Sequence, residues 1–449
     1  MVTPLPGAAA PVPHVVVIGG GFGGLYVARS LEHAPVRVTV IDRQNYHLFQ
    51  PLLYQVATAA LSPADIATPI RSILAKQENA TTLLAEAVDI DLDRQEVVLD
   101  DGRVAFDYLV VATGARHSYF GHKEWESLAP GLKEIDDALA MRRRIFLSFE
   151  AAEREHDPER RAALLTFVVV GGGPTGVELA GALGEITRET LTHDFRSIDP
   201  AQARIYLVDS GPRVLRSYPE RLSQSAQEQL EKRGVTVLTG STVAAIDADG
   251  VSLQSGERIE AHTVLWAAGV VASPLGKALG ASLDSAGRVK VNPDLSVPGH
   301  PNIFVVGDLA ALTNKKGEQL PGVAQVAIQG GKSVAANIVR AIEQRPTEPF
   351  HYRDYGSMAT IGRNAAVAQI GHVELTGFPA WMAWVMIHLL WLIGFRNRIF
   401  VMMQWAWVYI SHKRGARLIT MVDRNAGIIP YRRWSRAARR IDTHLDATG

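Results

Sequence analysis

The stretch from His14 to Leu31, HVVVIGGGFGGLYVARSL, constrains the fold of this chain more than any other segment. It begins with a short, apolar, β-branched run that is typical of a buried parallel strand. The glycines that follow, Gly19, Gly21 and Gly24, have the spacing G-x-G-x-x-G, and residues 25–31 continue as a helix. In that order the glycines permit a tight turn, contact with a pyrophosphate and close packing of helix on strand.

An acidic residue completes the pattern. A second strand is predicted over residues 36–41, and Asp42 follows it directly. A carboxylate at this position can accept hydrogen bonds from the hydroxyls of a ribose. The glycines alone would also fit a turn that binds nothing. Strand, glycines, helix, strand and acid together predict a dinucleotide site.

The same pattern occurs a second time between Leu165 and Ala182, LTFVVVGGGPTGVELAGA. A strand again leads into the turn and a helix again leaves it. The glycines of this second copy are Gly171, Gly173 and Gly176. An internal repeat of this kind predicts two dinucleotide-binding domains in one chain.

The acid of the second copy is Asp209, which ends a strand predicted over residues 203–208. Its separation from the glycines exceeds the usual spacing of about 20 residues. We attribute the excess to a helix extension and a loop over residues 187–200. A carboxylate favours NADH over NADPH, because it binds a free 2′-hydroxyl and repels a 2′-phosphate. Arg213 is close enough in sequence to oppose that preference.

Small or acidic residues follow other predicted strands, at the sheet edge where α/β proteins bind ligands. Thr113 and Gly269 each follow a buried strand, and Asp308 follows the strand predicted over 303–306. Pro51 begins an apolar helix that we expect beside the first nucleotide. Ordinary structural roles also fit, namely a cap or turn residue for Asp308 and packing on the sheet for the helix.

We therefore predict an α/β fold with two Rossmann-like dinucleotide-binding domains, the second inserted in the first. Residues 1–13 are rich in Pro and Ala and are expected to form a disordered lead-in. The other expected boundaries are 14–118 and 295–345 for the first domain, 119–294 for the second, and 346–449 for a C-terminal region.

Composition narrows the chemistry. The 449 residues include 46 basic and 46 acidic side chains, so nothing suggests nucleic acid as a partner. The chain contains no cysteine, which excludes electron transfer through a protein dithiol and thiolate metal sites. We expect no metal centre. The N-terminal residues lack the features of a signal or transit peptide, so we expect the nucleotide sites on the cytoplasmic side.

The C-terminal region contains an unusual apolar segment. Residues 378–395 include no Lys, Arg, Asp or Glu, and Arg396 and Arg398 separate them from a second apolar run. Five of the eight tryptophans fall between residues 381 and 407. Such a composition is typical of a membrane interface. We expect two amphipathic helices that lie in the interface; a transmembrane span and a buried dimer-interface helix remain alternatives.

Gln325 and Gln329 stand four residues apart on a helix predicted over 324–342, so they share one face. Their amides could bind a carbonyl group, although a solvated helix face explains the same spacing. With a flavin in the first site and a nicotinamide in the second, hydride donor and acceptor would meet. A membrane-bound oxidant then points to a quinone.

At this point the chain resembles the type II NADH:quinone oxidoreductases, single-subunit flavoproteins of the respiratory chain that do not pump protons. The resemblance covers nearly all of residues 14–415. The motifs that carry it are IGGGFGG, YHLFQPLLYQVAT, GGGPTGVELAG, VVGD, AQVAIQGG and the Trp-rich C-terminal region. The chain departs from many members in carrying Asp rather than Glu at both ribose positions.

The resemblance implies roles for particular residues. Non-covalent FAD would bind at Gly19, Gly21, Gly24 and Asp42, with Asp308 at its ribityl chain. NADH would bind at Gly171, Gly173, Gly176 and Asp209. Glu178 matches the acid beside the nicotinamide and the flavin, and Gln325 and Gln329 match the glutamines that line the quinone site. The resemblance further implies a homodimer held by its C-terminal helices on the cytoplasmic face of the cell (inner) membrane.

Two other readings remain open. The chain could be a soluble NADH-dependent reductase of a protein electron carrier, with the Trp-rich segment as an oligomer interface. It could also be a non-catalytic flavoprotein, although two complete nucleotide patterns argue against that. Sulfide:quinone oxidoreductases share the fold but depend on cysteines that this chain lacks. Whether the quinone is ubiquinone or menaquinone is left open.

Overall fold

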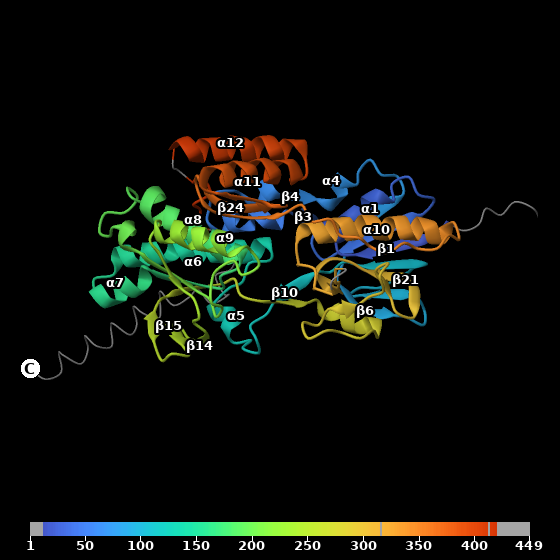
Figure 1. Ribbon diagram of the computed structural model, residues 1–449, viewed down its shortest axis with the longest axis horizontal. Coiled ribbons are helices and arrows are strands. Elements are labelled where there is room, and N and C mark those ends of the chain that lie inside the picture. The colour runs from blue at the N-terminus through green and yellow to red at the C-terminus, as the bar shows by residue number, and fades with distance from the viewer. Residues whose placement is uncertain (1–11, 315–316, 412–413, 420–449) are drawn as a thin grey trace, which may run out of the picture.

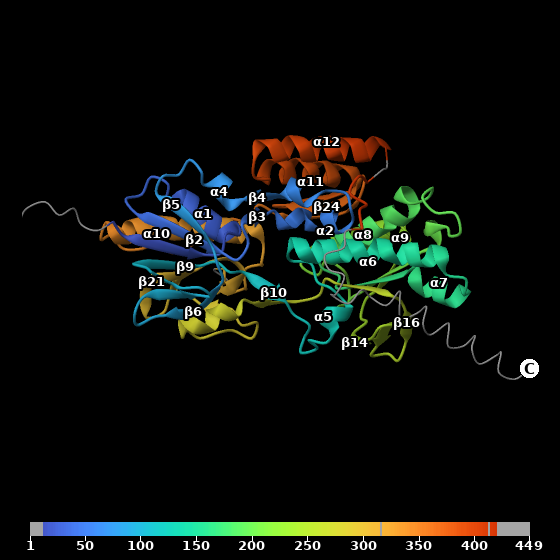
Figure 2. The same cartoon turned by 180° about the vertical axis from the view of Figure 1, so that it is seen from behind.

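The computed structural model describes residues 12–314, 317–411 and 414–419. Residues 1–11 of the expected lead-in and residues 420–449 of the expected C-terminal region lie outside the described residues. Figure 1 shows two α/β units side by side, with the C-terminal helices lying together along one edge. Figure 2 shows the same arrangement from behind.

The first unit is built on a six-stranded sheet with the order β20-β21-β9-β1-β2-β5. Its strands are β1 (His14–Ile18), β2 (Arg37–Asp42), β5 (Ala80–Leu84), β9 (Tyr108–Val111), β20 (Ser296–Val297) and β21 (His300–Val305). All pairs are parallel except β20 with β21. The chain moves outward from β1 to β2 and β5 and then returns to pair β9 with β1. The strand order therefore reverses between β1 and β9, which is where such sheets bind ligands.

The second unit repeats this plan in a parallel sheet with the order β13-β12-β11-β17. Its strands are β11 (Thr166–Val170), β12 (Arg204–Val208), β13 (Val235–Leu238) and β17 (Thr263–Trp266). The registers match as well, because Ile18 pairs with Ile41 just as Val170 pairs with Val208. In each unit the residue before the glycines thus lies beside the residue before the acid. The predicted internal repeat is confirmed.

Helices cover these sheets. In the first unit α1 (Phe22–Ser30) packs against α10 (Ala324–Ile342). The second unit carries α6 (Ile135–Arg154), α7 (Pro158–Leu164), α8 (Pro174–Glu185) and α9 (Glu220–Glu231). The helix extension expected after α8 is present as one π-helical turn, Ile186–Thr190. Each unit also carries a small three-stranded antiparallel sheet. It is formed by β6 (Ala87–Asp91), β7 (Glu96–Leu99) and β8 (Arg103–Ala105) in the first unit, and by β14 (Val243–Ile246), β15 (Gly250–Leu253) and β16 (Arg258–Glu260) in the second.

Two crossing strands connect the units. They are β10 (Ala115–His117) and β18 (Val270–Ala272), which pair antiparallel near the middle of Figure 1. Beyond β18 the side chains of Leu275, Leu279 and Val289 are buried in the core of the first unit. The chain therefore re-enters the first unit near residue 272, earlier than the expected boundary at 295.

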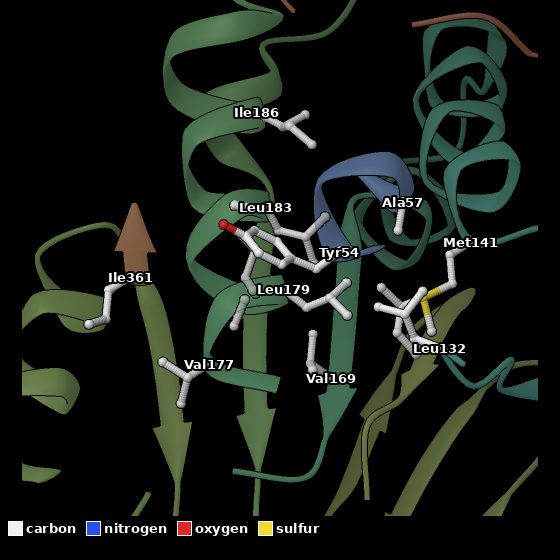
Figure 3. Packing of buried hydrophobic residues seen from close by; sticks show 14 of the residues in the cluster. Tyr54, Ala57, Leu132, Met141, Val169, Val177, Leu179, Leu183, Ile186 and Ile361 are labelled. Atoms are coloured by element: carbon white, nitrogen blue, oxygen red, sulfur yellow. The ribbon is translucent and has the colours of Figure 1, made fainter. Parts of the chain in front are cut away.

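One short helix crosses the boundary in the other direction. The helix expected after Pro51 is short: a 3-10 turn, Gln50–Leu52, leads into α2 (Leu53–Ala57). In sequence α2 belongs to the first unit, yet Tyr54 and Ala57 are buried with Leu179 and Leu183 of α8 in the core of the second. Figure 3 shows the Tyr54 ring beside α8 in this core.

The C-terminal region starts with the antiparallel strands β23 (Ser357–Gly362), β24 (Ala365–Ile370) and β25 (Val373–Thr376). Two helices follow, α11 (Gly377–Trp391) and α12 (Phe395–Ser411). Beyond α12 the buried Arg414 pairs with Glu185 of α8 at 2.7 Å and donates to the carbonyl of Thr58 at 2.8 Å. The region is thus built into the core and is not an appendage.

The expectation of amphipathic helices is wrong for α11. The helix carries no charged side chain. Its inner side buries Ala380 and Trp384, while its outer side exposes Phe378, Met382, Met386 and Leu390. One side packs on the protein core and the other remains apolar, so no polar side exists. No helix in the described part of the chain is both long and apolar enough to span a membrane.

Candidate functional site

A cavity of about 1550 Å³ opens where the strands of the first sheet end and extends to α11. Ligand pockets commonly measure about 300–1000 Å³, so this one could hold a large cofactor together with part of a substrate. The predicted site residues that line it are Gly19, Gly21, Asp42, Pro51, Thr113, Glu178, Gly269, Asp308 and Gln325. Those outside its lining are Gly24, Gly171, Gly173, Gly176, Asp209 and Gln329.

The first glycine turn is held by Asp42. Its carboxylate accepts hydrogen bonds from the backbone N–H groups of Gly20 at 2.6 Å and Gln44 at 2.7 Å. Burial raises the pKa of Asp42, and these two hydrogen bonds oppose the rise. Gly24 serves packing, because a Cβ there would overlap the carbonyl oxygen of Gly19. A Cβ on Gly21 would meet no atom within 4 Å, so the space beside it is open.

Two observations test whether these residues fit a flavin dinucleotide. The hydroxyl oxygen of Thr113 is buried and has no hydrogen-bond partner among the described residues. A buried polar atom of this kind is normally paired, so it points to a ligand. The open space at Gly21 lies before the N-terminus of α1, where backbone N–H groups attract phosphate. The site therefore fits FAD.

The second glycine turn has the same construction. Asp209 accepts hydrogen bonds from the N–H groups of Gly172 at 2.6 Å and Gly211 at 2.7 Å. A Cβ on Gly176 would overlap the carbonyl oxygen of Gly171, whereas the space at Gly173 is open. This turn lies outside the cavity lining, but the α8 helix that follows it contributes Pro174, Thr175 and Glu178 to the lining.

The arginine beside Asp209 differs from the one expected. Arg213 donates to the carbonyls of Tyr218 at 2.9 Å and Arg216 at 3.0 Å, so it holds its own loop together. The guanidinium of Arg216 lies 4.0 Å from the Asp209 carboxylate. Sequence reasoning missed Arg216 because the loop folds back on itself.

Glu178 reaches the cavity from the first half of α8. Burial raises the pKa of its carboxyl group well above the ordinary value, against a hydrogen bond from the backbone of Thr360. The group therefore keeps its proton to a higher pH than an ordinary glutamate does. A strongly shifted carboxyl group in a cavity is typical of a functional site.

The two glutamines of α10 are not equivalent. Gln325 lines the cavity, while its amide donates to the carbonyl of Gly356 at 2.8 Å and accepts from the N–H of Tyr355 at 3.1 Å. Gln329 lies one turn further along and makes both of its bonds to the backbone of Arg353. Both amides thus hold residues 353–356, and only Gln325 also faces the cavity.

Among the cavity residues that were not predicted are two polar side chains. His388 of α11 donates from Nδ1 to the carbonyl of Trp384 at 2.8 Å, and burial lowers its pKa to about 4. It is therefore a neutral hydrogen-bond acceptor at Nε2. Tyr54 of α2 is the other. A signal existed for His388, the one titratable residue in the apolar stretch 378–395.

This combination of fold and site is that of a two-domain flavoprotein, and comparison with known proteins agrees. Residues 13–331 match the pyridine nucleotide-disulphide oxidoreductase family, and residues 355–413 match the NDH2 C-terminal domain. The structure of NDH2 from Plasmodium falciparum, solved in complex with NADH, superposes with a TM-score of 0.84 at 20% identity. It covers 91% of this chain and 100% of that one, which supports the fold.

Proteins of similar sequence identify the family more narrowly than the structural comparison does. The type II NADH:quinone oxidoreductase Ndh of Mycobacterium tuberculosis is 48% identical over 431 residues, 92% of each chain. The demethylphylloquinone reductase NdbB of Synechocystis is 31% identical and covers 88% of this chain and 95% of its own. The chain therefore belongs to the pyridine nucleotide-disulphide oxidoreductases and, within them, to the type II NADH:quinone oxidoreductases.

Proposed function

We propose that the cavity is where this type II NADH:quinone oxidoreductase brings its two substrates to a non-covalently bound FAD. The observation that carries the proposal is that the strand ends of the first sheet, Glu178 and the apolar helix α11 meet around one cavity. FAD, when bound, supplies the two-electron chemistry between nicotinamide and quinone. A covalent thioether to the flavin is excluded because the chain has no cysteine.

The chain's own residues would bind and orient FAD and NADH. The two glycine turns would hold the pyrophosphates at the N-termini of α1 and α8. Asp42 and Asp209 would accept hydrogen bonds from the riboses of FAD and NADH, and Asp308 would contact the ribityl chain. Glu178, whose pKa is raised by burial, would stand beside the nicotinamide and the flavin.

The C-terminal helices favour the hypothesis that the quinone reaches the cavity from a membrane. We call eight exposed apolar side chains of α11 and α12 the apolar face: Phe378, Met382, Met386, Leu390, Phe400, Met403, Trp407 and Ile410. On α11 this face adjoins the cavity residues Ile387, His388 and Trp391. Exposed apolar surface of this extent is typical of an interaction site. We propose attachment to one leaflet on the cytoplasmic side, with the chain as a homodimer.

Substitution of the two glutamines tests where the quinone binds. Gln325→Leu should raise the quinone KM about twofold to tenfold, because one hydrogen bond is worth about 0.5–1.5 kcal/mol. Flavin reduction by NADH without quinone, followed by stopped-flow absorbance, should be unchanged. Gln329→Leu is the matched comparison, because it loses the same kind of bond to residues 353–356 without facing the cavity.

Equal effects of the two variants would mean that the glutamines act by holding the segment 353–356. Wild-type quinone kinetics in both would place the quinone elsewhere. In that case a wild type that reduces a soluble protein carrier faster than any quinone would favour the alternative function, a carrier reductase.

Nicotinamide choice should depend on Asp209. We expect the wild type to favour NADH over NADPH in kcat/KM by at least about tenfold, which corresponds to roughly 1.4 kcal/mol. Asp209→Ala should narrow the ratio, because it removes the repulsion and frees Arg216 to meet a 2′-phosphate. Arg216→Ala in that background should restore part of the preference for NADH. Equal use of both cofactors by the wild type would contradict the assignment.

A further inference from the structure

Three side chains form a chain of hydrogen bonds that leads from α12 to the cavity. The indole nitrogen of Trp405 lies 2.7 Å from Oε1 of Gln55, and Nε2 of Gln55 lies 2.8 Å from the hydroxyl oxygen of Tyr54. Gln55 and Tyr54 are buried, and Tyr54 lines the cavity. The hydrogen bond between Trp405 and Gln55 joins residues that are 350 positions apart in the sequence.

The chemistry of these three side chains determines which atom donates in each of the two hydrogen bonds. An indole N–H can only donate, so the atom of Gln55 that it meets must be the amide oxygen. The NH₂ group of Gln55 therefore faces Tyr54, and because that group can only donate, the hydroxyl oxygen of Tyr54 accepts. The hydrogen of the hydroxyl must then point away from Gln55.

That hydrogen is left without a partner in the described part of the protein. The structure shows no acceptor for it among the residues that it describes. Burial raises the pKa of Tyr54 well above its ordinary value, so the hydroxyl stays protonated. Glu178 and Gln325 line the same cavity. Figure 3 shows that the ring lies against α8, the helix that carries Glu178.

We propose that Tyr54 donates a hydrogen bond to a carbonyl oxygen of the quinone, and that Gln55 and Trp405 orient its hydroxyl for this purpose. The inference rests on the proposed binding of quinone in the cavity. A quinone carbonyl only accepts, and Tyr54 is held as a donor. His388, an acceptor at the same cavity, offers the complementary group for a hydroquinone hydroxyl. Tyr54 touches the substrate in this scheme, while Gln55 and Trp405 are positioning residues.

Tyr54→Phe keeps the ring and removes the hydroxyl. We expect quinone kcat/KM to fall about fivefold, the size of one neutral hydrogen bond. Flavin content, flavin reduction by NADH and the unfolding temperature should stay near wild type. Tyr108→Phe, on β9 and outside the cavity lining, controls for the loss of a tyrosine hydroxyl and should leave quinone kinetics unchanged.

A double-mutant cycle separates orientation from packing. Trp405→Phe keeps an aromatic ring on α12 but removes the indole N–H, and it should lower quinone kcat/KM by about twofold to fivefold. In the Tyr54→Phe background it should have no further effect, because there is no hydroxyl left to orient. Additive losses in the double variant would show that Trp405 acts only through packing and would overturn its role.

The outcomes distinguish this inference from the proposed function. If the wild type oxidises NADH but reduces no quinone, the proposed function fails. If quinone turnover is normal and Tyr54→Phe does not change it, the inference alone fails. Tyr218→Phe tests a second tyrosine as the donor, since Tyr218 also lines the cavity. A loss of quinone affinity in Tyr218→Phe and not in Tyr54→Phe would assign the donor to Tyr218 instead.

Discussion

Gly173→Val is expected to give a folded, yellow protein in which NADH no longer reduces the flavin. The backbone φ of Gly173 is −74°, which valine can adopt, and a Cβ there meets no protein atom within 4 Å. The side chain would instead fill the space for the NADH pyrophosphate. Hydrogen bonds to charged groups are worth about 1.5–3 kcal/mol each, so losing two should weaken NADH binding at least about a hundredfold. Stopped-flow reduction at increasing NADH concentration measures the loss.

The matched variant in the first repeat is Gly21→Val. Gly21 also has open space beside it, so this protein should fold but purify without FAD. Gly176→Val is different, because its Cβ would overlap the carbonyl oxygen of Gly171 and disturb the strand–helix packing itself. If Gly173→Val is reduced by NADH at the wild-type rate, or if Gly21→Val retains full FAD, the two sites are misassigned.

Met386→Asp with Leu390→Asp is expected to release the protein from membranes. These side chains are 56% and 58% exposed on the outer side of α11 and do not line the cavity. Burial of each in lipid is worth about 1.5–3 kcal/mol, so their loss should lower partitioning to vesicles at least about a hundredfold. Flotation with vesicles measures this, and turnover with a short-chain, water-soluble quinone should stay within about twofold.

Leu84→Asp with Leu147→Asp is the control, because it adds the same charge at exposed leucines away from the apolar face. Removal of both helices would be a poorer test, since Trp384 and Val401 are buried in the core. If the double variant still floats with vesicles, the apolar face does not contact the membrane. A change from dimer to monomer would then identify that face as the subunit interface.

Much of the candidate site could be predicted because it depends on short-range spacing. A buried strand, three glycines and a helix define a phosphate turn within 18 residues, and the acid follows at the next strand. Asp42 and Asp209 indeed hold the two turns in the same way. Roles that depend on longer-range contacts were less predictable. The spacing of Gln325 and Gln329 suggested equivalent residues, yet the fold of residues 353–356 against α10 leaves only Gln325 in the cavity.

The sequence by itself determined the two glycine turns, the repeat that relates them, the family and the apolar nature of the C-terminal helices. These features follow from residue types at local spacings, which backbone geometry translates directly into strands, turns and helices. Only the tertiary structure decided that α2 packs in the second unit, that α11 has no polar side and that Arg216 stands beside Asp209. It alone brought Trp405, Gln55 and Tyr54 into one chain, because the direction of each hydrogen bond depends on the partner that folding supplies.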